Sequence, residues 1–210
     1  MADWATISAL ATAGGTLVLA GATFASVRSA NRAARVAERS LLEGLRPLLV
    51  ASRPEDPPQK VNFIDGKWIM TPGGGAGAEA THDAIYLTLG LRNVGMGIAV
   101  LHGWRFYPGV NRDGDPREEL DAFTRLTRDL YVPSGDVGFW QGSFRDAGSP
   151  QFAGAREVIE AGGEWTLDLL YGDHEGGQRT IVRFAARARQ DDGWYAAAGR
   201  YWNLDRDDPR

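Results

Sequence analysis

The segment from Ala5 to Val27 contains no charged residue over 23 positions, and it constrains the fold more than any other part of the chain. A helix of this length spans about 34 Å, enough to cross the hydrocarbon core of a bilayer. Only seven of its residues are large and apolar, and the other 16 are Ala, Gly, Ser or Thr. We expect residues 1–27 to form a transmembrane helix. A cleaved signal peptide and a soluble helix within an oligomer are the alternatives.

The charges on either side of this segment predict its orientation. Asp3 precedes it, whereas residues 28–46 hold five arginines against Glu38 and Glu43, a local net charge of +3. The positive-inside rule then places the N-terminus outside the cell and the rest of the chain in the cytoplasm. A signal peptide would need a basic N-terminal region, and Asp3 is the only charged side chain there. The predicted location is therefore the cell membrane, crossed once.

Small residues in the apolar segment predict self-association of the helix. Ala11 with Gly15, and Gly21 with Ala25, are four positions apart, a spacing that lets two helices approach closely in lipid. Apolar or small residues also alternate at spacings of three and four from Thr6 to Leu41, as in the seam of a left-handed coiled coil. This pattern allows a homo-oligomer through this helix. The alternative is that a segment rich in small residues produces such a seam by chance.

Residues 28–46 are expected to form an arginine-rich juxtamembrane helix that continues the first helix and ends before Pro47. Arg28, Arg32, Arg35 and Arg39 fall on one stripe at helical spacing. Contact with anionic lipid headgroups would be worth about 1 kcal/mol per arginine near the surface. A solvated face that only sets the topology is the alternative.

From Pro47 onward the hydrophobic pattern changes from period 3.6 to period 2, which indicates one β domain over residues 47–204 and a charged, frayed tail over 205–210. Residues 47–210 hold 18 basic and 24 acidic residues, a net charge of −6, which argues against a nucleic-acid partner. The expected strands lie at residues 48–51, 61–64, 67–70, 85–91, 98–107, around 137–139 and 158–159, 165–171, 180–187 and 194–202.

Short strands with regular turn signals predict a mainly β fold, an antiparallel immunoglobulin-like β-sandwich. Asp65-Gly66 is the strongest hairpin signal. The glycine-rich stretch 71–80 is expected to be a flexible loop, and residues 117–129 a short helix or an irregular excursion within a larger insertion, 112–155. Most of the tryptophans are expected in the core.

The stretch Leu89–Pro108 (LGLRNVGMGIAVLHGWRFYP) resembles a strand–turn–strand of bacterial immunoglobulin-like domains, including CARDB-type modules. The matching residues are Asn93, Gly95 and Ala99, where Asn and Gly tolerate a turn or bulge and Ala packs as the next strand starts. The whole layout also resembles uncharacterised single-pass membrane proteins of high-GC Gram-positive bacteria. Neither resemblance implies an activity.

Residues that could carry catalysis or bind a metal form no recognised motif. Cysteine is absent, and His82, His102 and His174 have no metal-ligand spacing. Asp113-Gly114-Asp115 with Glu118-Glu119 does not fit the EF-hand spacing and is expected to be a turn before a helix. We therefore predict no cofactor, no metal and no enzymatic activity.

The function predicted from the sequence is a membrane-anchored interaction module that binds a protein partner or self-assembles at the membrane. The first alternative is a membrane-tethered enzyme or a domain that binds a small molecule or carbohydrate, which would require a pocket formed by groups such as His102, Arg105, Asp173 and His174. The second alternative inverts the topology and makes residues 47–210 an extracellular adhesion-like domain.

Overall fold

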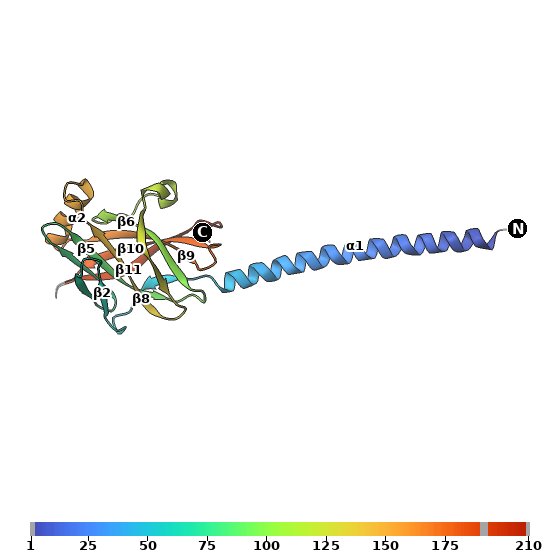
Figure 1. Cartoon of the computed structure of the whole chain (residues 1–210), viewed down its shortest axis with the longest axis horizontal. Coiled ribbons are helices and arrows are strands. Elements are labelled where there is room, and N and C mark those ends of the chain that lie inside the picture. Colours follow the sequence, from blue (N-terminus) through green and yellow to red (C-terminus); the bar gives the residue numbers. More distant parts are fainter. Residues whose placement is uncertain (1–2, 190–192, 209–210) are drawn as a thin grey trace. The chain divides into compact units, whose positions relative to one another are not determined.

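The computed structural model describes residues 3–189 and 193–208, apart from the side chain of Thr6. The chain divides into two compact units, Met1–Gly44 and Leu45–Arg210. The first unit is the helix α1, Trp4–Gly44, and we call the second the β unit (Figure 1).

The helix α1 runs for 41 residues without a break, which confirms that the apolar and arginine-rich segments form one helix. It contains no proline, and the hydroxyls of Thr12, Thr16 and Thr23 donate to carbonyls one turn earlier at 2.8–2.9 Å. These polar side chains are therefore satisfied within the helix and do not need water. By length and composition, α1 from Ile7 onward is long and apolar enough to cross a membrane.

The β unit is mainly antiparallel β structure, as predicted. Its strands are β1 (Leu49–Ala51), β2 (Gln59–Asn62), β3 (Trp68–Thr71), β4 (Gly75–Ala80), β5 (Ile85–Asn93), β6 (Ala99–Pro108), β7 (Thr124–Val132), β8 (Val137–Phe144), β9 (Trp165–Asp173), β10 (Arg179–Ala188) and β11 (Trp194–Asn203). A 3₁₀ helix, η1 (Pro116–Ala122), and a short helix, α2 (Pro150–Glu160), lie between strands.

Nine strands form one sheet in the order β1-β5-β4-β11-β10-β9-β6-β7, with β8 added to β5. The strand β5 is central, because β4 pairs with Ile85–Leu89, β1 pairs with Leu91–Asn93 and β8 pairs with Ile85–Arg92. The sheet curves into a half-barrel (Figure 1). The remaining strands, β2 and β3, form a separate hairpin around Asp65-Gly66, and Gly66 has the positive φ of +82° that this turn requires.

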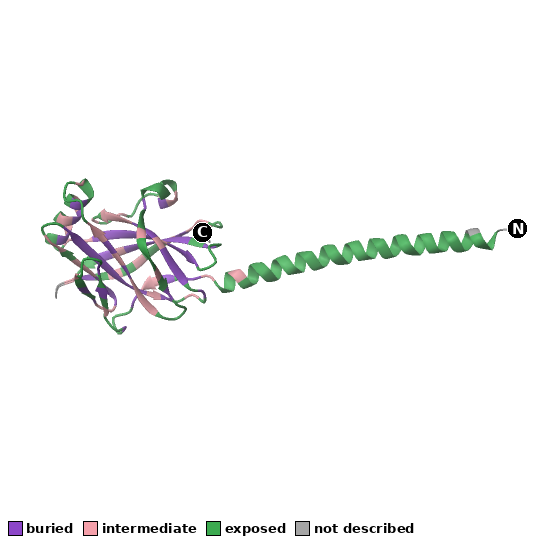
Figure 2. Ribbon diagram, in the orientation of Figure 1, coloured by how far each residue is buried: buried purple, intermediate pink, exposed green. Residues whose placement is uncertain are grey.

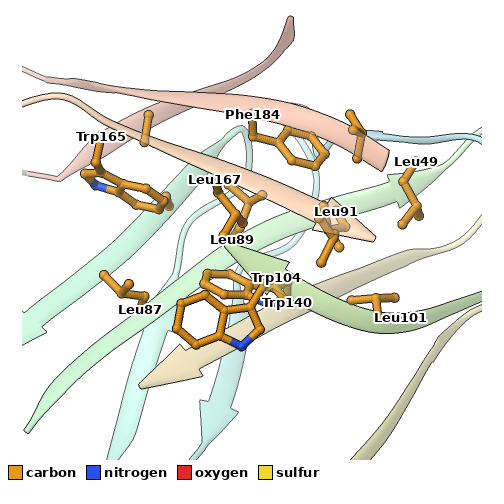
Figure 3. Close-up of a cluster of buried hydrophobic side chains, with 14 of the residues drawn as sticks. Leu49, Leu87, Leu89, Leu91, Leu101, Trp104, Trp140, Trp165, Leu167 and Phe184 are labelled. Atoms are coloured by element: carbon orange, nitrogen blue, oxygen red, sulfur yellow. The ribbon is translucent and has the colours of Figure 1, made fainter. Parts of the chain in front are cut away.

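The main core lies inside the curved sheet. Leu87, Leu89 and Leu91 of β5 are fully buried, and the rings of Trp104 and Trp140 meet edge to face at 5.3 Å (Figure 3). Trp165 and Phe184 belong to the same cluster. Five of the tryptophans are buried, namely Trp104, Trp140, Trp165, Trp194 and Trp202, whereas Trp68 is half exposed on β3.

Two segments differ from their predicted structure. The glycine-rich stretch 71–80 is not a flexible loop: its second half is the strand β4, in which a Cβ on Gly77 would lie 2.7 Å from Oγ1 of Thr88. Here glycine allows close packing. Val158 and Ile159 lie in α2, not in a strand, because Ser149 caps that helix, Pro150 begins it, and Phe152, Ala155 and Ile159 form its buried face.

The excursion and the tail are more ordered than expected. Residues 117–129 contain all of η1 except its first residue, and most of β7. In the tail, Asp205 pairs with Arg46 and Asp208 pairs with Arg117, so the described part of it is fixed to the β unit. The last two residues, 209 and 210, lie outside the described part.

Candidate functional site

The small residues predicted to mediate self-association are accessible on α1. Ala11, Gly15, Gly21 and Ala25 are all exposed, and a Cβ built on either glycine would have no other atom within 4 Å (Figure 2). The surface at these positions is therefore open to close approach by another helix. Whether a second copy occupies it stays a prediction.

The four arginines of the juxtamembrane stripe lie together on α1. Arg28, Arg32, Arg35 and Arg39 are exposed and share one side of the helix with Phe24, Val27 and Val36. Cationic heads beside apolar side chains are typical of a helix near a lipid surface. The arrangement is compatible with headgroup contact, which also stays a prediction.

Asn93, one of the residues that resemble immunoglobulin-like domains, is buried. Its side chain bonds to the segment that precedes β1 and to the turn between β5 and β6. Its Oδ1 accepts from the backbone N–H of Leu48 at 3.1 Å and of Gly95 at 3.0 Å. Its Nδ2 donates to the carbonyls of Gly97 at 2.6 Å and Val132 at 3.0 Å. One side chain thus links the β5–β6 turn to two other segments.

The glycines of this turn allow the backbone of residues 45–48 to pack closely against it. A Cβ on Gly95 would lie 2.4 Å from the carbonyl oxygen of Arg46, and a Cβ on Gly97 would lie 1.8 Å from that of Leu45. Ala99 is buried at the start of β6. Arg46 itself pairs with Asp205, and the Asp205 carboxylate also accepts from the N–H of Arg179. Asn93, Gly95 and Gly97 therefore hold the segment Leu45–Leu49 in place, whereas Ala99 only packs in the core.

Of the groups proposed for a catalytic pocket, Asp173 is buried and close enough to His102 to affect its pKa, whereas the others have separate environments. His82 and His174 are exposed, whereas burial lowers the pKa of His102 below its ordinary value, aided by Arg179. Arg105 pairs with Glu119. Among the described residues, no group of three or more His, Asp or Glu side chains is placed to hold a metal ion.

The acidic residues of the excursion have structural partners. The Asp115 carboxylate caps η1 by accepting from the N–H of Arg117, and it also pairs with the Arg117 guanidinium. Glu119 pairs with Arg105, and the Asp113 carbonyl accepts from Arg183. The prediction of a turn before a helix is confirmed, with a 3₁₀ helix in place of an α-helix.

A buried ion pair that the sequence does not predict joins Arg183 and Asp168, beside the small core cluster that contains Trp202. Both Nε and Nη2 of Arg183 donate to Asp168 at 2.7 Å, and Tyr107 donates to the same carboxylate at 3.1 Å. The Arg183 guanidinium lies between the rings of Tyr107 and Trp202, at 5.5 and 4.9 Å from their centroids. Burial, with Asp168 beside it, raises the pKa of Tyr107 to about 12. This cluster joins β6, β9, β10 and β11, and we assign it a structural role.

A groove runs along the seam between β7 and β8. Two adjoining hollows, of about 640 and 90 Å³, share the lining residues Phe63, Thr127, Arg128, Gln141 and Ser143. We call this surface, together with Trp104, Arg125 and Arg145, the seam groove. Its larger hollow has the size of an ordinary ligand site.

The inner part of the seam groove is aromatic. Trp104 lines it, and the ring of Trp140 packs against Trp104 beneath Gly142. A Cβ on Gly142 would lie 2.5 Å from Cζ2 of Trp140 and 3.1 Å from Cε2 of Trp104, so glycine is required for these rings to pack there. The groove therefore has an apolar inner wall.

The rim of the seam groove is cationic. Arg125, Arg128 and Arg145 line it, and none of its described lining residues is Asp or Glu. Arg145 donates to Asp65 at 2.9 Å, and the hydrogen bond from Tyr86, together with Arg145, holds the pKa of Asp65 below its ordinary value. Arg128 donates instead to the side chain of Gln141 at 2.6 Å and to the carbonyl of Asn62 at 3.4 Å. In the described part of the chain, no carboxylate lies within ion-pair distance of Arg128.

No family model and no curated protein matches this chain. Among solved structures, it is similar to a protein from Archaeoglobus fulgidus, with a TM-score of 0.25 and 10% sequence identity over 61% of this chain and 93% of that one. A similarity at this level carries no argument about function.

Proposed function

We propose that this protein is a single-pass membrane-anchored binding module, with α1 as the anchor and the β unit as the part that meets a partner. The observation that carries the proposal is the exposed apolar surface of α1. All seven of its large apolar residues between Ala5 and Val27 are exposed on α1, and no other part of the helix covers them.

The energetics favour a bilayer over water for this segment. Each large apolar residue contributes about −0.3 to −0.6 kcal/mol to insertion, so the seven together favour it by about 2–4 kcal/mol. Thr12, Thr16 and Thr23 oppose insertion little, because their hydroxyls already donate within the helix. The arginines that follow keep the β unit on the cytoplasmic side under the positive-inside rule.

Two further features support a binding role over catalysis. The exposed small residues Ala11, Gly15, Gly21 and Ala25 fit a homo-oligomer through α1. The seam groove offers a cationic surface on a β unit whose net charge is −6 over residues 47–210. The proposal includes a fold family for the β unit, the immunoglobulin-like sandwich of bacterial single-pass proteins. The antiparallel strands and the Asn93 turn support it.

The test combines membrane fractionation with cysteine labelling, which the natural absence of cysteine makes clean. Asp3→Cys and Glu175→Cys each place one thiol on an exposed position. We expect both variants in the membrane fraction, with Asp3→Cys alone labelled by an impermeant maleimide in intact cells. Labelling of Glu175→Cys alone would reverse the orientation and favour the adhesion-like alternative. Recovery of the chain as a soluble species without detergent would refute the anchor.

A further inference from the structure

The strand β8 has one edge that no other strand covers. Its residues Val137–Phe144 pair with β5, and in the described part of the chain no ladder joins β8 to β7. The Asn93 N–H donates to Asp136 at 3.0 Å at the end of this ladder. Because hydrogen-bonded pairs alternate along antiparallel strands, Phe139, Gln141 and Ser143 direct their N–H and C=O groups toward the seam.

The middle of β7 leaves its own ladder at the same place. Leu101 of β6 pairs with Leu130 and Gly103 pairs with Arg125, so His102 alone faces the four residues Leu126–Asp129. These four residues form a bulge in β7, beside the place where the described residues show no ladder between β7 and β8. The seam is therefore an interruption of the sheet with backbone groups on both sides.

A side-chain contact bridges the seam where a ladder would otherwise run. Arg128 and Gln141 are equally far from the β7–β8 turn, four residues from Val132 and from Val137, and the guanidinium donates to the amide oxygen at 2.6 Å. A cationic side chain beside an open strand edge also discourages unspecific pairing. A carboxylate would be a stronger acceptor for Arg128 than this neutral amide.

The two sides of the seam groove differ in character, so they favour a strand whose side chains alternate between two kinds. Successive residues of a strand point to opposite faces. A strand added to β8 would therefore place one set of side chains on the inner side, toward Trp104 and Gly142, and the other set on the outer side with Gln141. The inner side is apolar, and the outer rim carries Arg128 and Arg145. Exposed Ile64 at the end of the groove adds apolar surface for a macromolecular partner.

We propose that the seam groove binds an extended peptide segment with alternating acidic and apolar residues, which pairs with the open edge of β8. The acidic residues replace Gln141 as acceptors for Arg128, and the apolar residues pack on the inner side beside the partly buried Leu126. This mode is strand addition, in which backbone hydrogen bonds supply affinity and alternate side chains supply specificity. The inference rests on the proposed function, because it names the partner of the binding module.

The test measures binding of a fluorescein-labelled peptide, as long as β8 and of alternating Val and Glu, to the full chain purified in detergent. Fluorescence anisotropy is expected to show saturable binding, and a Val/Lys peptide of equal length is expected not to bind. Two further peptides carry N-methyl groups on the Val amides or on the Glu amides. At least one of them is expected to bind about tenfold more weakly, because a methylated amide cannot donate to β8.

The matched variants are Arg128→Gln and Arg187→Gln, the second being an exposed arginine on β10 away from the groove lining. Arg128→Gln is expected to weaken binding about tenfold, because it removes a charge-assisted hydrogen bond, and Arg187→Gln to leave it unchanged. Equal binding by wild type and Arg128→Gln would overturn the proposal. So would binding that is insensitive to both methylation patterns, or full competition by inorganic phosphate, which would indicate a small-anion site.

The same preparation separates this inference from the membrane anchor. Flotation of the full chain with liposomes reports on α1, whereas peptide anisotropy reports on the β unit. A chain that floats without binding the peptide refutes the groove assignment and keeps the anchor. A chain that binds the peptide without floating refutes the anchor and keeps the groove.

Discussion

In α1, Leu17 and Phe24 keep 74% and 69% of their surface exposed, whereas Leu87 and Leu89 in the β unit expose none. The two units contain the same kinds of large apolar residue and differ in where burial comes from. The β unit covers its leucines with its own tryptophans and neighbouring strands (Figures 2 and 3). α1, taken by itself, leaves its large apolar residues uncovered. The environment of α1 and the stability of the β unit are therefore expected to respond to different substitutions.

The largest effect is expected when charged residues are placed in the middle of α1, because they oppose its insertion into the membrane. Each aspartate in Leu17→Asp/Leu19→Asp costs about 2.5–3.5 kcal/mol for insertion at a helix centre, more in total than the apolar residues contribute. We expect the variant to leave the membrane fraction while the melting temperature of the β unit stays unchanged. Flotation and tryptophan fluorescence melting measure the two effects. Leu17→Ile/Leu19→Ile is the control and should float like wild type.

Loss of the buried ion pair in the β unit is expected to lower the stability of that unit and to leave membrane insertion unchanged. Arg183→Met leaves the Asp168 carboxylate buried without its bidentate partner and should destabilise the β unit by about 3–5 kcal/mol. Denaturant unfolding measures this loss, and flotation should not change. Adding Asp168→Leu to Arg183→Met should recover much of the stability. A double variant as unstable as the single one would contradict an electrostatic cause.

A smaller loss of unfolding free energy is expected when Asn93, which holds the segment after α1, is substituted. Asn93→Ala removes the partner of two backbone N–H groups and two carbonyls and should cost about 2–3 kcal/mol of unfolding free energy. Asn93→Asp keeps the acceptor for Leu48 and Gly95 but loses both donors. It is expected to be at least as unstable as Asn93→Ala in denaturant unfolding, because a buried carboxylate then faces the carbonyl oxygens of Gly97 and Val132. Equal stability of all three proteins would show that Asn93 is not the organising residue.

The smallest effect is expected for lipid contact by the arginine stripe. Arg28→Gln should lower the preference of the full chain for spin-labelled phosphatidylglycerol over phosphatidylcholine by about 1 kcal/mol, or fivefold. Arg28→Lys keeps the charge and serves as the control. The stripe would be only a topology signal if Arg28→Gln and Arg28→Lys showed the same lipid preference.

Local patterns predicted much of the fold, because they act over neighbouring residues. An uncharged run followed by arginines without proline specified α1, and alternation with Asp65-Gly66 specified the β2–β3 hairpin. The strand β4 was missed because its glycines are suited to close packing against Thr88 and Trp194, which are distant in sequence. The helix α2 was missed although Ser149-Pro150 is a helix start signal, because Val158 and Ile159 suggested a strand.

The candidate site was less accessible to sequence reasoning. The Asn93 motif was identified as a turn, but its bond to Leu48 joins residues 45 positions apart. Arg128 and Gln141 look like ordinary surface residues in the sequence, which does not reveal the bulge in β7 or the missing ladder between β7 and β8. Charged Asp168 and Arg183 within two apolar strands were the available signal for the buried ion pair. Such pairs depend on strand register, which composition and periodicity do not specify.

The three arginines at the seam groove also affect whether two copies of the protein associate through their β8 edges. Two β8 edges that met would form an isologous contact, in which a two-fold axis brings each surface against its own image. Arg125, Arg128 and Arg145 of one copy would then lie near the same residues of the other. Like charges at such a contact repel, so the open edge disfavours aggregation with itself and stays accessible to a chain of opposite charge.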